Sequence, residues 1–76
     1  MNKEKRLSEL RVGECARVLG LRSQGSMRRR FLDVGLSPGT LVFCVGKSPL
    51  GDPLAYMVRG CEIAIRKRDS QTVIIE

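Results

Sequence analysis

The stretch that decides the fold is Arg28-Arg29-Arg30-Phe31-Leu32-Asp33-Val34-Gly35-Leu36-Ser37-Pro38-Gly39-Thr40. It predicts a helix, the end of that helix and a tight turn. Met27, Phe31 and Val34 recur at spacings of four and three residues, which is the period of an amphipathic helix. The pattern predicts a helix over residues 26–34, with the three arginines on its remaining circumference. A helix this short is marginal in isolation, so we expect its apolar stripe to pack on the rest of the chain.

Both ends of this helix carry recognisable signals. Ser23 or Ser26 is the expected N-terminal cap, because a serine hydroxyl accepts a hydrogen bond from a free backbone N–H. Gly35 stands where a helix favours a left-handed residue, and Leu36 is placed for the apolar contact that accompanies such an end. Pro38 followed by Gly39 then predicts a type II turn.

Outward from this turn, the C-terminal half predicts strands joined by turns. The expected segments are a strand at 41–45, a loop at 46–53, a strand at 54–59, a hairpin at 59–62, a strand at 63–66, a polar turn at 67–71 and a strand at 72–75. The hairpin is predicted to be type II′, with Gly60 as its first central residue. Loops of this length between strands are common binding sites, so the loop at 46–53 is a candidate for function.

Upstream, residues 15–20 predict a first strand, with Ala16 and Val18 on one face. Leu7 and Leu10 are spaced as a single turn that packs onto the core like a lid. We expect residues 1–6 to form a flexible start and residues 7–76 to form one domain. About five short strands with one helix after the first predict a mainly β, SH3-like barrel in preference to an OB-fold.

The chain of 76 residues carries a net charge of +6, and this excess is unevenly placed. Nine basic and three acidic residues lie in residues 1–30, while residues 31–76 are balanced. An excess of this kind indicates an anionic partner or surface, although solvation alone also explains many charged faces.

The sequence argues against catalysis and metal binding. It contains no His, so Ser-His and Cys-His nucleophile pairs are excluded. Cys15, Cys44 and Cys61 form no Cys-x-x-Cys pair, and we expect free thiols in a reducing cytoplasm, with Cys15 and Cys44 buried in their strands. We therefore predict no catalytic residue, no metal site and no cofactor. The longest apolar run, residues 41–45, is far too short to span a bilayer.

Two functions remain after these exclusions. Small basic barrels bind nucleic acid, but base stacking needs exposed aromatic side chains, and of Phe31, Phe43 and Tyr56 we expect only Tyr56 to be exposed. The other function is a protein-interaction module that presents a groove or loop on a rigid scaffold.

Several segments together resemble the FeoA family of bacterial ferrous iron transport. The segments are Leu7-x-x-Leu10, Gly13-Glu14, Ala16-x-Val18, Arg28-x-x-Phe31-Leu32-Asp33-x-Gly35-Leu36, Pro38-Gly39-Thr40, Pro49-Leu50-Gly51-Asp52-Pro53 and Val58-x-Gly60-x-x-Ile63-Ala64-Ile65-Arg66. The resemblance covers roughly residues 7–76. It implies an SH3-like barrel and a cytoplasmic accessory protein that binds and modulates FeoB, the membrane transporter with a GTPase domain.

The same resemblance leaves one relative as an alternative, the SH3-like domain of iron-dependent repressors. That alternative is weaker because no helix-turn-helix segment precedes the barrel. We expect no metal role for the cysteines, and an oligomeric state between monomer and weak homo-oligomer. Contact with the inner face of the membrane would run through the partner or through the surface charge.

The expected partner-binding residues are the outward arginines of the helix and two loop residues. They are Arg28, Arg29, Arg30, Leu50 and Pro53. Simple solvation of the arginines and self-packing of the loop are the competing explanations.

Overall fold

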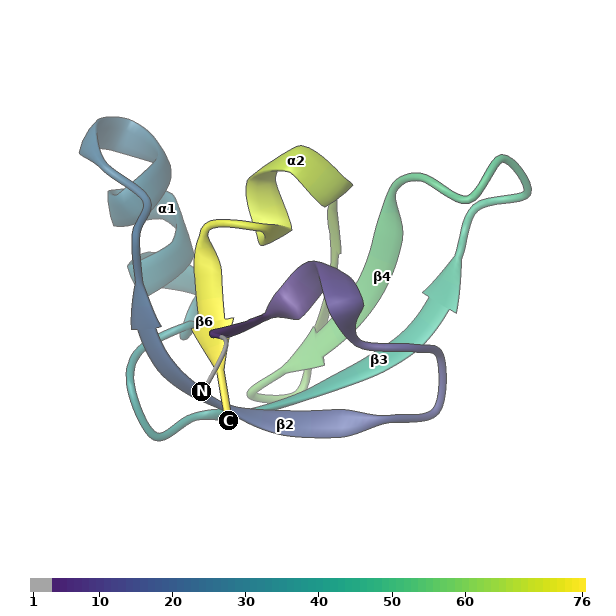
Figure 1. Ribbon diagram of the computed structural model, residues 1–76, viewed down its shortest axis with the longest axis horizontal. Helices are drawn as coiled ribbons and strands as arrows, with labels where there is room; N and C mark the ends of the chain where they lie inside the picture. The colour runs from purple at the N-terminus through teal and green to yellow at the C-terminus, as the bar shows by residue number, and fades with distance from the viewer. Residues whose placement is uncertain (1–3) are drawn as a thin grey trace.

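One antiparallel sheet, bent around a small core, organises the chain (Figure 1). The computed structural model describes residues 4–76. The elements are β1 (Lys5–Arg6), η1 (Leu7–Glu9), β2 (Cys15–Leu21), α1 (Gly25–Val34), β3 (Leu41–Lys47), β4 (Leu54–Val58), β5 (Cys61–Ile65), α2 (Lys67–Ser70) and β6 (Val73–Ile75). The strand order is β1-β6-β2-β3-β4-β5. The predicted mainly β architecture, with one sizeable helix after the first long strand, is confirmed.

The bend of the sheet comes from β2, which serves two neighbours. Its first half pairs with β3, from Cys15 opposite Phe43 to Arg17 opposite Leu41. Its second half pairs with β6, and the register shifts between Val18 and Gly20. A bulge of this kind lets a strand turn from one layer of a barrel into the other.

The core draws on every layer of the fold. Its members are Leu7, Leu10, Val18, Phe31, Leu36, Val42, Cys44, Leu54, Tyr56, Val58, Ile65, Val73 and Ile75. Tyr56 is completely buried, and its hydroxyl lies 3.4 Å from the Leu7 carbonyl oxygen, to which it donates. The expected lid at residues 7–10 is confirmed, because Leu7 and Leu10 are both buried against this core.

The end of α1 follows its prediction closely. Gly35 is left-handed, with φ 107°, and its N–H donates to the Leu32 carbonyl at 3.1 Å. The Leu36 N–H reaches back to the Phe31 carbonyl at 2.9 Å, and the Leu36 side chain is fully buried. This pair of bonds is the Schellman arrangement, which satisfies carbonyls that the helix leaves free.

The start of α1 differs from its prediction. Gln24 is the N-cap residue, and no side chain caps the helix. The Ser23 hydroxyl is instead buried and lies 2.6 Å from the Thr72 hydroxyl. Ser26 lies inside the helix, so neither serine makes the expected cap. The Ser23 hydroxyl therefore makes a tertiary contact with Thr72, just before β6, in place of the helix cap that the local sequence predicts.

Both predicted turns form, although one has a different type. The turn at 37–40 has φ 93° at Gly39 and a Thr40 N–H to Ser37 carbonyl bond of 3.1 Å, as type II requires. In the β4–β5 hairpin, Val58 pairs with Cys61, so the central residues are Arg59 and Gly60. Their φ values of 51° and 82° make a type I′ turn. The predicted type II′ turn is therefore wrong, because Gly60 is the second central residue of the turn and not the first.

The sequence does not predict β1. Lys5 and Arg6 pair with Ile75 and Ile74 of β6, so they are part of the sheet and not a flexible start. Two residues carry no periodic signal, and backbone pairing with a distant strand fixes them. Residues 1–3 of the expected flexible start lie outside the residues that the structure describes.

Replacing Gly35 is expected to destabilise the fold. Its left-handed backbone disfavours a Cβ, and a Cβ built there would lie 2.6 Å from the Arg59 Cδ atom. We expect Gly35→Ala to lower the free energy of unfolding by at least about 1–2 kcal/mol, measured by urea denaturation. Gly20→Ala is the control, because Gly20 has no heavy atom within 4 Å of that position. Equal stability of the two variants would contradict the importance of this helix end.

Candidate protein-interaction surface

The three predicted arginines of α1 face solvent. Phe31 turns the opposite side of the helix into the core, and this leaves Arg28, Arg29 and Arg30 exposed. The Arg28 guanidinium donates to the Leu21 carbonyl at 3.1 Å, which ties it to the end of β2. The predicted exposure of this arginine run is therefore observed.

A second basic run lies on the same side of the molecule as α1, and the sequence reasoning missed it. Arg66, Lys67 and Arg68 are exposed around the start of α2, which Figure 1 shows beside α1 at the upper face. Arg30 and Arg66 line one groove of about 260 Å³ between α1 and β5, whose wall also includes Asp69. The run is visible in the sequence, but the balanced charge of residues 31–76 hid its local excess.

The two loop residues of the predicted site lie apart from α1. Leu50 is 94% exposed at the tip of the β3–β4 loop, whereas Pro53 is half-buried. The loop closes on itself through the Ser48 N–H and the Pro53 carbonyl at 3.0 Å. Figure 1 shows this loop and α1 at opposite sides of the view, with α2 between them. The structure therefore does not bring the arginines and the loop residues into one continuous site.

The β3–β4 loop is nonetheless held in place. An Asp52 carboxylate oxygen accepts the backbone N–H of Lys67 at 2.9 Å, which joins the loop to α2. The Ser48 hydroxyl donates to the Asp52 carbonyl at 2.8 Å. Leu50 is thus presented on an anchored loop, as a large apolar side chain with little contact to the protein itself.

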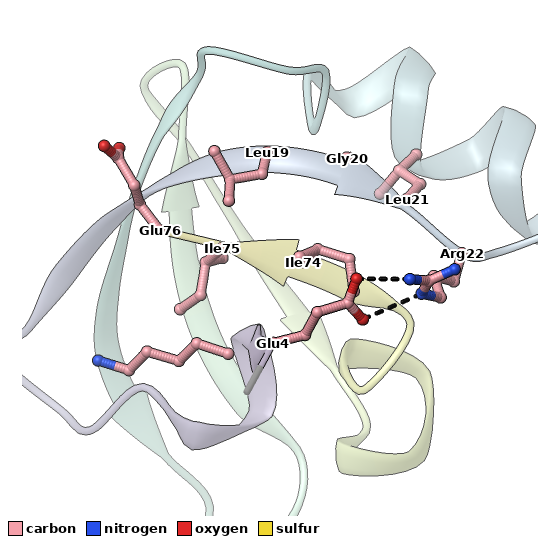
Figure 2. Close-up of a pocket in the computed structure, with 9 residues that line it drawn as sticks. Glu4, Leu19, Gly20, Leu21, Arg22, Ile74, Ile75 and Glu76 are labelled. Atoms are coloured by element: carbon pink, nitrogen blue, oxygen red, sulfur yellow. Dashed lines mark hydrogen bonds and ion pairs between the residues drawn. The ribbon is translucent and has the colours of Figure 1, made fainter. Parts of the chain in front are cut away.

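A wide hollow lies over β2 and β6 (Figure 2). It measures about 770 Å³, with Leu19 of β2 and Ile74 of β6 among its walls. Glu4 and Arg22 meet at one end, where the Arg22 Nε donates to a Glu4 carboxylate oxygen at 3.1 Å. Glu4 and Arg22 satisfy each other, so this pair offers little to a ligand.

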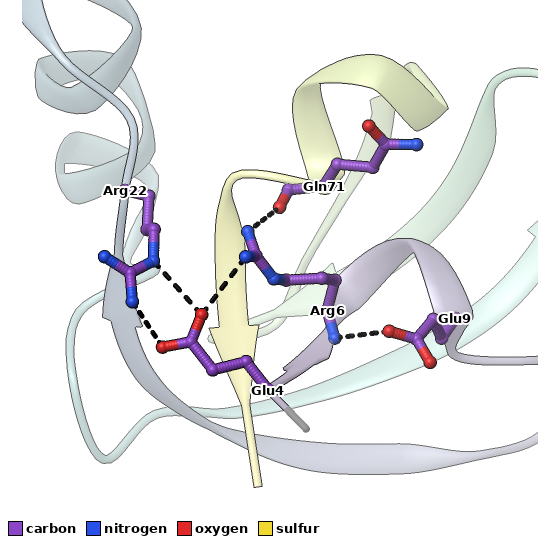
Figure 3. A network of polar contacts seen from close by, with 5 residues as sticks. All are labelled: Glu4, Arg6, Glu9, Arg22 and Gln71. Carbon is purple, nitrogen blue, oxygen red and sulfur yellow. Dashed lines mark hydrogen bonds and ion pairs between the residues drawn. The ribbon is translucent and has the colours of Figure 1, made fainter. Parts of the chain in front are cut away.

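Glu4 neutralises part of the basic excess of residues 1–30. It also pairs with Arg6, whose guanidinium donates to the Gln71 carbonyl at 2.7 Å (Figure 3). The hydrogen bond from Arg22 is the main cause that holds the pKa of the Glu4 carboxyl below its usual value. This network fastens β1 to the barrel, and it leaves the helix arginines as the more available cations.

The cysteines and aromatic residues only partly follow their predictions. Cys44 is buried, and burial raises the pKa of its thiol. Cys15 is exposed, contrary to expectation, because it takes an outward position on β2 opposite Phe43. The aromatic prediction is also wrong: Tyr56 is buried, and Phe43 is 43% exposed.

Two further possibilities receive no support from residues 4–76. Within them, no three His, Cys, Asp or Glu side chains are grouped as a metal site would require. None of the helices in this part of the chain has the length and apolar character needed to cross a membrane.

Comparison with known proteins decides the family. The model of the FeoA domain matches residues 5–76. The chain belongs to the FeoA family. A FeoA-like protein from Clostridium acetobutylicum shares 32% identity, covers 100% of this chain and 88% of its own, and superposes with a TM-score of 0.87. The zinc-complexed FeoA of Stenotrophomonas maltophilia, described as an SH3 domain protein, shares 28% identity over 95% of this chain and 89% of its own, with a TM-score of 0.85.

One relative carries the FeoA domain inside a much longer polypeptide. The Fe(2+) transport protein A/Fe(2+) transporter FeoB fusion protein of Porphyromonas gingivalis is 31% identical over 71 residues. The match covers 93% of this chain and 8% of that protein. The chain therefore spans less than a tenth of the length of this curated relative.

The FeoA fold is shared with proteins of a different kind. A manganese-dependent transcriptional repressor superposes with a TM-score of 0.82 at 13% identity, over 99% of this chain and 42% of its own. At that identity the likeness concerns the fold alone.

Thiol labelling is expected to separate the three cysteines of this FeoA domain. N-ethylmaleimide should modify Cys15 and Cys61 in the folded protein and Cys44 only in urea, because burial shields Cys44 and raises its pKa. Intact mass spectrometry measures the number of adducts, with Cys44→Ser as the control. Labelling of Cys44 in native protein as fast as Cys15 would contradict its burial.

Proposed function

We propose that this chain is an accessory protein of ferrous iron uptake that binds FeoB and modulates its assembly or its GTPase-coupled transport. The observation that carries the proposal is the Porphyromonas gingivalis relative, in which a domain similar to this one is named as part of a single protein with FeoB. Covalent fusion of two proteins favours their action together, because a tether raises their effective concentration for each other.

The proposed role is one of binding, without catalysis by this chain. The sequence holds no His, and the Glu4 carboxylate, whose pKa is lowered by the hydrogen bond from Arg22, is paired with arginines at the surface. The surface instead offers groups that suit protein contact. We propose that Arg28, Arg29 and Arg30 form the electrostatic part of the FeoB interface.

The loop would supply the apolar part of the same interface. Leu50 is almost wholly exposed on an anchored loop, and burying such a side chain is favourable by about 1.5–3 kcal/mol. Pro53, half-buried at the base of the loop, would support it. Because α1 and this loop lie apart, the proposed partner must span both sides of α2, as a large membrane protein could.

We further propose that the protein works on the cytoplasmic side of the membrane. The helices α1 and α2, which both carry exposed cations, lie on one side of the molecule, and this favours anionic headgroups as well as an acidic partner surface. Nucleic acid is less favoured, because Tyr56 is buried and Phe43 alone offers an exposed ring for stacking.

Charge reversal of α1 is expected to weaken capture of FeoB. In detergent extracts of membranes, the triple variant Arg28→Glu, Arg29→Glu, Arg30→Glu should bind FeoB at least roughly tenfold less tightly, since each close charge contributes on the order of 1 kcal/mol. The control variant reverses the exposed Lys5, Arg11 and Arg17, which lie outside α1 and the 46–53 loop, and changes the net charge equally. If both variants lost the same affinity for FeoB, the effect would come from net charge and not from the α1 arginines. If the wild-type protein did not capture FeoB at all, the FeoB proposal would be refuted.

Leu50 is expected to matter for binding and not for folding. We expect Leu50→Ser to weaken FeoB capture while leaving the free energy of unfolding within about 0.5 kcal/mol of the wild type. Urea denaturation and the same capture assay measure the two quantities. Undiminished capture would remove Leu50 from the interface.

A further inference from the structure

Three of the four exposed positions of β3 are apolar, and the fourth is Lys47 at the end of the strand. Leu41, Phe43 and Val45 alternate with buried residues, yet each remains 39–43% exposed. The solvated face of an antiparallel sheet usually carries polar side chains at such positions. Three successive apolar residues on an open strand face therefore need an explanation outside the barrel itself.

The neighbouring strands extend this apolar face sideways. Residues that pair directly across an antiparallel sheet point to the same side. Phe43 pairs with Cys15 of β2 on one side and with Met57 of β4 on the other. Beyond Met57, the outermost member of this row is Glu62 on the edge strand β5. The row is thus uncharged across three strands.

Two arginines border the face at the end nearest the turn at 37–40. Arg17 lies opposite Leu41 on β2, and its guanidinium donates to the Gly39 carbonyl at 2.8 Å. Arg59 follows β4, and its guanidinium reaches the Thr40 hydroxyl at 3.5 Å. Both side chains are therefore drawn toward the same turn.

A hollow opens between Arg59 and the apolar row. It measures about 480 Å³, and Leu41, Phe43 and Met57 contribute its apolar wall, with Arg59 at its rim. No acidic residue among those described lines it. A hollow with apolar walls and cationic edges is complementary to a bulky apolar side chain that stands beside a carboxylate.

We propose that this face docks a segment of a partner protein in which bulky apolar residues are flanked by acidic ones. Phe43 and Met57 would contact the apolar side chains, and Arg17 and Arg59 would pair with the carboxylates. A second copy of this chain fits less well, because two such faces would bring more arginines than glutamates together. This surface is separate from the α1 arginines and from Leu50, so the inference goes beyond the proposed function.

A pair of short peptides tests the face directly. The probes are the acetylated, amidated tetrapeptides Glu-Leu-Phe-Glu and Lys-Leu-Phe-Lys, titrated into the ¹⁵N-labelled full chain and followed by amide chemical shifts. We expect the acidic peptide to shift the amides of Leu41, Phe43 and Met57, with a Kd of about 1 mM, as befits a short probe. The basic peptide should bind at least roughly fivefold more weakly, because the rim is cationic.

Two variants and one control assign the effect to named residues. Phe43→Ser should abolish the shifts, while Leu50→Ser, which removes an exposed leucine elsewhere, should leave them unchanged. The double variant Arg17→Gln, Arg59→Gln should bind both peptides alike, and it keeps the apolar row intact if Phe43→Ser fails to fold.

Several results would overturn the proposal. They are the absence of shifts, equal binding of both peptides to the wild type, or shifts that map to α1. A further one is a wild-type dimer, seen by sedimentation equilibrium, that Phe43→Ser dissociates, since the face would then be covered by a second copy. None of these outcomes depends on FeoB, so the docking face and the proposed function can fail separately.

Discussion

The left-handed end of α1 is the constraint on which the rest of the structure depends. At Gly35 the chain leaves the helix, and Leu36 carries it directly into the core. The turn at 37–40 then delivers β3 in register with β2, while the Arg59 side chain lies across Gly35 and ties the β4–β5 hairpin to the same point. One residue without a side chain thus fixes the relation of helix, sheet and hairpin.

Local chemistry predicted those parts of the fold in which one residue type meets one backbone requirement. The positive φ values expected at Gly35 and Gly39 are confirmed. The spacing of Leu7 and Leu10 also predicted correctly that this turn packs on the core. The failures have a common physical cause. The predicted Ser23 cap failed because the Ser23 hydroxyl bonds to Thr72. The strand at Lys5–Arg6 was not predicted because it pairs with β6, about seventy positions away in the sequence. In the first case a long-range contact overrode a local preference, and in the second it created a strand that no local pattern predicts.

The candidate site was harder to predict because exposure depends on which face of a strand looks outward and on what covers it. The arginines of α1 were correctly expected to face solvent, since the helical stripe defines the opposite side. The exposed aromatic residue was not correctly predicted. Phe43 and Tyr56 both lie in apolar strands, and only the sheet register decides which of them faces solvent and which faces the core. Likewise, the charge of Arg66–Arg68 became meaningful only when folding set α2 beside α1.

The pairing of β1 with β6 has a consequence for architecture. Lys5 lies opposite Ile75, so the two ends of the described chain run side by side at one margin of the sheet. A linker added at either end would leave from that margin. The domain is therefore suited to serve as an appended module as readily as a separate protein. If the proposed association with FeoB holds, a separate domain lacks the tether of the fusion protein, and its contact surfaces would have to supply the affinity that a shared polypeptide otherwise provides.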